Sequence, residues 1–91
     1  MNILMRTEVF KEDDQFVALA PDLNVSSFGE SVEDARASLK EAVEAFLEEC
    51  EKMGSLEEVL AESGFQKSGD SWVLKERVFQ EELAVAIWTP Q

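Results

Sequence analysis

The sequence predicts an α+β domain in which one long helix packs across a face of an antiparallel sheet of four to five strands. Strand-like segments stand at both ends of the chain, a long amphipathic segment lies between them, and turn signals separate the segments. The predicted order is β-β-β-α-α-β-β, with a short second helix after the long one. A chain of 91 residues has the size of one domain, so residues 1–91 are interpreted as a single unit.

Three strands are predicted before the long helix. Residues 2–11 alternate in polarity, and a polar break separates them from residues 16–20, as in a hairpin. Apolar side chains on both faces of residues 16–20 favour a central strand, and Pro21 ends it because proline has no N–H for the ladder. Residues 25–28 form the short third strand.

The long helix is predicted at residues 32–53, after the capping box Ser31-Val-Glu-Asp34. Its apolar residues recur at three- and four-residue spacing and form one stripe. Gly54 suits the C′ position that follows a helix. The core beneath this helix is expected to contain Val17, Leu19, Leu39, Val43 and Phe46.

A second capping box at residues 55–58 predicts a short helix directly after the first. Gly64 would be the C′ residue of that helix, and Leu60 would then contact Phe65 across a Schellman end. The ends of both helices are therefore predicted from local signals.

The C-terminal residues return to a strand pattern. Residues 65–67 and 72–78 are predicted strands around a turn, and it stays open whether residues 72–88 form one strand or two. The apolar run that follows has no Lys or Pro before Pro90, and such an edge tends to pair with another chain. The predicted interface of a homodimer or higher homo-oligomer is Leu83, Val85, Ile87 and Trp88. Alternatively, the chain is a monomer whose short helix covers the open face of the sheet.

The net charge of −12, from 20 acidic and 8 basic residues, bears on partners and location. Nucleic-acid surfaces need clustered Lys and Arg, and only Lys75 and Arg77 come near to a cluster, so direct DNA binding is not expected. An acidic surface suits a basic protein partner, or else simply keeps the chain soluble. No apolar run approaches the ~20 residues of a membrane span, and no signal-peptide pattern is present, which predicts a cytoplasmic protein.

No residues group into a predicted active site. The chain has no histidine, and its one cysteine, Cys50, lies on the apolar stripe of the long helix, where a buried side chain is a better interpretation than a reactive thiol. The acidic residues 12–14 lack the glycine and the spacing of a calcium loop and are interpreted as a solvated turn. We therefore expect no enzyme activity, no metal site and no cofactor.

Residues 16–47, FVALAPDLNVSSFGESVEDARASLKEAVEAFL, join several of these signals in one order. An apolar strand that ends in a proline precedes a strand of small residues, a glycine and a helix that begins Ser-Val-Glu-Asp-Ala. This arrangement resembles the HicB-like antitoxin family over about the first fifty residues. The resemblance implies a core similar to a partial ribonuclease H-like fold without its catalytic acids. It also implies a non-catalytic function, in which the chain neutralises a small basic ribonuclease of the HicA type by covering its active surface.

The chain departs from the family pattern in two places. Residues 66–91 resemble neither DNA-binding module that family members often carry at the C-terminus, and Asp22-Leu-Asn-Val25 replaces a Pro-Gly-Cys that many members show. The contact with a partner is predicted at Asp22, Leu23, Asn24, Ser26 and Phe28. The alternative function is that of a HicB-like orphan, a self-assembling binding or scaffold protein without a toxin.

Overall fold

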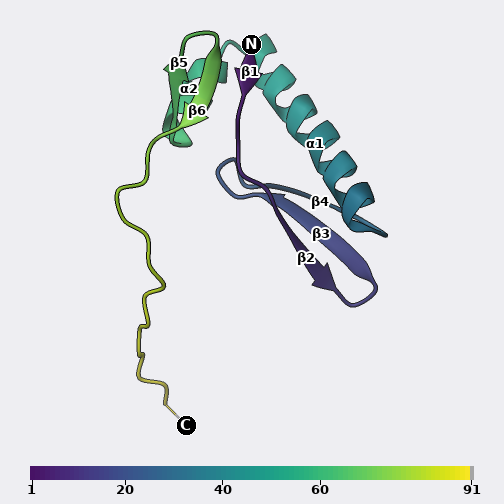
Figure 1. The fold of residues 1–91 in the computed structure, drawn as a ribbon, viewed down its shortest axis with the longest axis vertical. Helices are drawn as coiled ribbons and strands as arrows, with labels where there is room; N and C mark the ends of the chain where they lie inside the picture. Colours follow the sequence, from purple (N-terminus) through teal and green to yellow (C-terminus); the bar gives the residue numbers. More distant parts are fainter. Residues whose placement is uncertain (91) are drawn as a thin grey trace.

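The computed structural model describes residues 1–90 and has an α+β architecture (Figure 1). Its elements are β1 (Asn2–Ile3), β2 (Glu8–Glu12), β3 (Gln15–Ala20), β4 (Val25–Gly29), α1 (Val32–Lys52), α2 (Leu56–Glu62), β5 (Phe65–Ser68) and β6 (Ser71–Leu74). The α+β class and the succession of a long and a short helix are confirmed. Within the described residues no helix combines the length and apolar character that a bilayer span requires.

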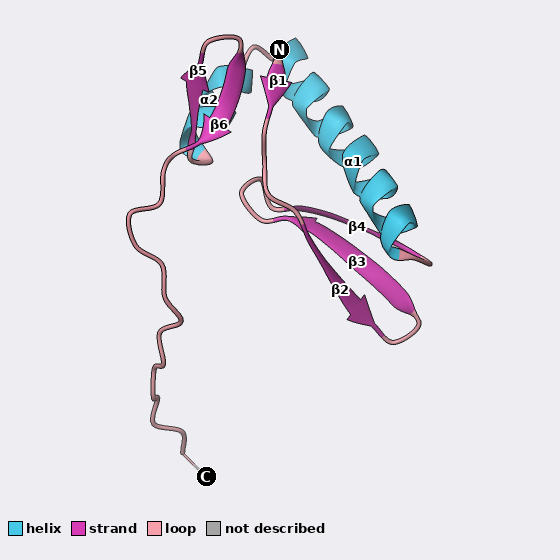
Figure 2. Ribbon diagram, viewed as in Figure 1, coloured by secondary structure: helices cyan, strands magenta, loops and turns pink. Residues whose placement is uncertain are grey.

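The strands form two three-stranded sheets, so the prediction of one sheet with four to five strands is wrong. One sheet has the antiparallel order β2-β3-β4, and the other has the order β1-β6-β5 with β1 parallel to β6 (Figure 2). The predicted strand at residues 2–11 is divided because its two parts have different partners. Its first part pairs with β6 and its second part pairs with β3, and the residues between them belong to no strand.

Helix α1 begins and ends close to where the sequence predicts. The Ser31 hydroxyl accepts a hydrogen bond from the Asp34 N–H at 3.1 Å, which is the first half of the capping box. At the other end Gly54 has a φ of 73°, and the Ser55 N–H donates to the Cys50 carbonyl at 2.9 Å, as in a Schellman motif. The Ser55 hydroxyl also donates to that carbonyl, at 3.3 Å, and makes no cap for α2. The second capping box is therefore not formed, because Ser55 serves the end of α1 instead.

Helix α2 ends just before Gly64, as predicted, although only one of the two hydrogen bonds of a Schellman motif is present there. Gly64 has a φ of 95°, and its N–H donates to the Ala61 carbonyl at 3.2 Å. Leu60 and Phe65, the two residues expected to meet across this end, are the largest fully buried side chains among those described. Helix α2 packs against β5 and α1, so it does not cover the other sheet.

The core between α1 and the β2-β3-β4 sheet is built on small side chains. Ala18 and Ala20 of β3 and Ala35 of α1 are fully buried. A Cβ atom on Gly29 would lie 2.5 Å from the Ala35 nitrogen, so α1 begins in direct contact with the end of β4. The face of β3 that meets the helix is thus the one that carries the alanines.

This choice of face corrects the predicted core. Leu39 and Val43 are buried, as predicted. Val17 and Leu19 are only half-buried and lie on the other face of β3, because successive side chains of a strand alternate between faces. Phe46 is 38% exposed and lies outside the core.

The C-terminal strand pattern is not realised as predicted. The strand predicted at residues 72–78 ends at Leu74, and residues 75–90 have no helix or strand. These residues run away from the rest of the molecule (Figure 1), so no strand within residues 1–90 lies beside them to pair with. The predicted strand of Leu83, Val85, Ile87 and Trp88 is consequently an exposed segment in the single chain.

Candidate protein-binding surface

The face of the β2-β3-β4 sheet that points away from α1 carries a row of exposed apolar side chains. Phe10 of β2 lies opposite Val17 of β3, which lies opposite Phe28 of β4, so the three share one face. Phe10 is 48% and Phe28 is 63% exposed. We call this surface the open face; it comprises Glu8, Phe10, Glu12, Gln15, Val17, Leu19, Ser26 and Phe28.

Two tight connections hold the three side chains in register. Asp13, between β2 and β3, has a φ of 53°, and Asn24, between β3 and β4, has a φ of 56°. Asp and Asn are the non-glycine residues that adopt this left-handed conformation most readily, which explains their positions. Because a shift of one residue would turn a strand's side chains to the opposite face, these turns also decide that Phe10 and Phe28 are exposed together.

The open face carries negative charge along β2 and at the β2–β3 hairpin. Glu8 and Glu12 lie on it, and Asp13 and Asp14 form the hairpin at its end. Arg6 precedes the sheet, but its guanidinium already binds the Asp22 carboxylate, with nitrogen–oxygen distances of 2.6 and 3.3 Å. The surface therefore combines an apolar row with acidic groups.

The five residues predicted to bind a partner are found in different environments. Leu23 is only 8% exposed and belongs to the core, so it supports the turn and does not present a surface. The side chain of Asp22 is 13% exposed and is bound to Arg6. Asn24, Ser26 and Phe28 are exposed, and the last two lie on the open face.

Phe10, Val17 and Leu19 belong to this surface, but the sequence patterns did not indicate it. The alternation in residues 2–11 placed Phe10 opposite Val9, but it did not say which of the two faces the helix covers. The burial of Ala18 and Ala20 identifies that face only in the folded chain.

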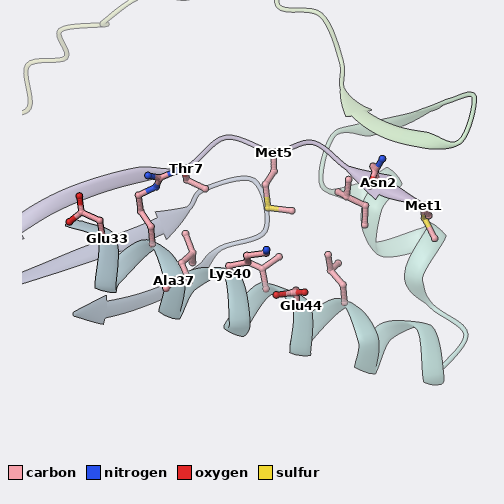
Figure 3. Close-up of a pocket in the computed structure, with 13 residues that line it drawn as sticks. Met1, Asn2, Met5, Thr7, Glu33, Ala37, Lys40 and Glu44 are labelled. Atoms are coloured by element: carbon pink, nitrogen blue, oxygen red, sulfur yellow. The ribbon is translucent and has the colours of Figure 1, made fainter. Parts of the chain in front are cut away.

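A groove of about 680 Å³ lies elsewhere, between residues 1–7 and α1 (Figure 3). We call it the N-terminal groove. Apolar side chains form much of its lining: Ile3, Met5, Leu39, Val43 and Leu47. Met5 points from the N-terminal segment towards the helix, and Lys40 and Glu44 lie along the helix side of the groove.

A second exposed apolar segment is the C-terminal arm, which we define as residues 81–88. Its four predicted interface side chains are between 72% and 84% exposed: Leu83, Val85, Ile87 and Trp88. Cys50, by contrast, is buried as predicted. Within residues 1–90 no three His, Cys, Asp or Glu side chains form a group that could hold a metal ion.

Comparisons of the chain with models of protein families, with curated proteins and with solved structures found no match. The resemblance to the HicB-like family therefore rests on the pattern of residues 16–47. The surfaces described above are the remaining basis for a functional argument.

Proposed function

We propose that this protein is an antitoxin-like, non-catalytic protein that binds a small basic ribonuclease of the HicA type and inhibits it by covering its active surface. The observation that carries the proposal is the open face, where Phe10, Val17 and Phe28 form an apolar row whose two rings stay 48% and 63% exposed among the described residues. Large exposed apolar side chains beside one another are typical of protein-binding surfaces.

Aromatic side chains at such a surface suit the centre of an interface. Aromatic residues are enriched in the buried centre of protein interfaces. They are also frequent among the residues whose substitution weakens binding most. Phe10 and Phe28 flank Val17 across the three strands, so a partner that covers the row would bury both rings at once.

The charge around the row selects the chemistry of the partner. Glu8, Glu12, Asp13 and Asp14 lie beside it on β2 and the hairpin, and the whole chain carries a net charge of −12. Complementary charge accelerates association and disfavours partners of like charge. A basic protein fits this surface, and a ribonuclease is basic because its RNA substrate is an anion.

The test is a titration of the purified chain against a HicA-type ribonuclease, with calorimetry for affinity and RNA cleavage for inhibition. We expect the substitution Phe28→Ser to weaken binding by about tenfold or more, as for an aromatic residue at the centre of an interface. Phe79→Ser is the matched control, because Phe79 is 76% exposed but lies outside the open face and the arm. Binding that is equally sensitive to both substitutions, or absent, would contradict the proposal.

A second series tests the charge. Glu8→Lys combined with Glu12→Lys should slow association and reduce its dependence on salt, while dissociation changes less. If the double substitution leaves the association rate unchanged, Glu8 and Glu12 do not attract the partner to the open face.

The alternative function is that of an orphan scaffold protein that assembles with itself and has no toxin. The exposed C-terminal arm favours self-assembly as such, but it does not distinguish an orphan from an antitoxin that is also oligomeric. A short reading frame for a basic protein beside the gene would favour the antitoxin.

A further inference from the structure

The C-terminal arm has the pattern of a β-strand that lacks a partner. Leu83, Val85 and Ile87 occupy alternate positions and would share one face of a strand, yet each is more than 70% exposed. Such an apolar edge pairs readily with another chain. The arm therefore needs a second strand edge with which to pair.

The N-terminal groove offers a free strand edge. Asn2 and Leu4 donate their N–H groups to the Asp70 and Trp72 carbonyls, at 3.4 and 2.9 Å. Because backbone groups alternate between the two edges of a strand, those of Ile3 point to the other edge of β1. Strand β1 is the last strand on that side of its sheet, and the groove lies between it and α1.

The apolar residues of the arm span about the same distance as the apolar residues of α1 that line the groove. Leu83 to Ile87 spans about 13 Å in a strand. Leu39 to Leu47 spans about 12 Å along the helix. Three apolar side chains of the arm can therefore lie over Leu39, Val43 and Leu47, which line the groove.

Charge sets the direction of the arm, although the lining of the groove also includes the carboxylates of Glu33 and Glu44. Arg36 and Lys40 line the groove, and neither forms an ion pair with another described residue. In the arm, Glu81 and Glu82 come directly before Leu83. When these carboxylates lie beside the two cations, the apolar residues that follow extend towards Leu47, away from Glu33 at the other end of the lining.

We propose that two copies of this chain exchange C-terminal arms, each arm lying as an added strand in the N-terminal groove of the other copy. A second copy is the occupant because the arm leaves the molecule on the side of β5 and β6 that is remote from α1 (Figure 1). The exchange is reciprocal, so the contact closes as a symmetric dimer. The open face takes no part in it, and the dimer therefore does not depend on the proposed toxin partner.

Light scattering of the full chain across a dilution series tests the dimer. The substitution Val85→Glu should raise the dimer dissociation constant by at least about tenfold, because it would bury an unpaired charge in the groove. Val78→Glu is the matched control, since Val78 is 95% exposed and precedes the arm. Circular dichroism verifies that both variants keep their helices. A monomer at high micromolar concentration, or a dimer indifferent to Val85→Glu, overturns the proposal.

Charge reversal identifies the receiving surface. Arg36→Glu and Glu81→Lys should each weaken the dimer about twofold to fivefold, as for an exposed ion pair, since Glu81 shares the strand face of Leu83. The variant with both substitutions should recover most of the affinity. If the single substitutions weaken the dimer but the double variant does not recover its affinity, the arm binds a different surface.

Cross-linking distinguishes two arrangements. In one the two copies exchange arms, and in the other each arm binds the groove of its own chain. In a Cys50→Ala background, a chain with Ala37→Cys at the groove is mixed with a tagged chain that carries Leu83→Cys, the arm residue placed nearest to Ala37. We expect an oxidised heterodimer between the two chains. A chain with both substitutions that closes only an internal disulfide would overturn the exchange.

Discussion

Leu39 lies where α1 packs against the β2-β3-β4 sheet, and only 2% of its surface is exposed. Its neighbours across the core include Ala18 and Ala20, whose small side chains leave room for a larger residue from the helix. Phe46, about two turns further along α1, is 38% exposed and contributes less. At the residue scale, the stability of the core therefore depends on a few aliphatic side chains of α1.

We predict that Leu39→Ala lowers the free energy of unfolding by about 2–5 kcal/mol, since it removes a buried side chain and leaves a cavity. Urea denaturation monitored by circular dichroism measures the change. Phe46→Ala, in the same helix, should cost clearly less because its ring is partly in solvent already. An equal loss in the two variants would show that Leu39 is not the better buried residue.

At the scale of the element, the ends of the helices determine how α1 and α2 are connected. Helix α1 begins at a serine cap and ends in a Schellman motif, and the last residue of that motif, Ser55, is also the residue before α2. The two helices are therefore joined without a flexible linker. This tight connection directs α2 towards β5 and leaves the open face uncovered.

Removal of the N-cap should weaken α1. Ser31→Ala deletes the acceptor of the Asp34 N–H and should cost about 0.5–2 kcal/mol. Ser38→Ala within the same helix is the matched control and should be neutral or stabilising, because alanine has the higher helix propensity. Chemical denaturation of the two variants measures the difference, and equal effects would argue against the cap.

Charge is the feature that matters at the scale of the whole molecule. A net charge of −12 on 91 residues makes the folded chain repel itself. Between residues 1 and 90 only two ion pairs lie within 4 Å, those of Arg6 with Asp22 and of the N-terminus with Asp70, and the latter is exposed. Salt therefore screens more repulsion than attraction.

We predict that the thermal midpoint rises with salt, from low ionic strength to about 0.5 M NaCl, where the Debye length is only a few ångströms. A gain of about 1 kcal/mol would correspond to a rise of about 4–8 °C for a domain of this size. Differential scanning calorimetry below the dimer concentration range measures the effect on the single chain. An uncharged osmolyte at equal osmolality is the control, and a midpoint that falls with salt would contradict the prediction.

The sequence by itself determined the helices and their ends, together with the α+β class. The cap supplied by Ser31, the Schellman end at Gly54 and the turn at Gly64 need hydrogen bonds only between residues a few positions apart. Such bonds depend on local residues, so a local pattern predicts them. Ser55 is the exception, because two adjacent motifs require the same side chain and only one can have it.

Only the tertiary structure decided which face of each strand is buried and which strands pair. The burial of Ala18 in preference to Val17 follows from the close approach of α1 at Gly29, which alternation alone cannot indicate. Likewise, β1 separates from β2 because its partner β6 lies about seventy residues along the chain. Phe28 was therefore predicted at the surface without Phe10 and Val17 beside it. Residues 81–88 have the pattern of a strand but no neighbouring strand in the described part of the chain, and a strand forms only where another backbone completes its hydrogen bonds.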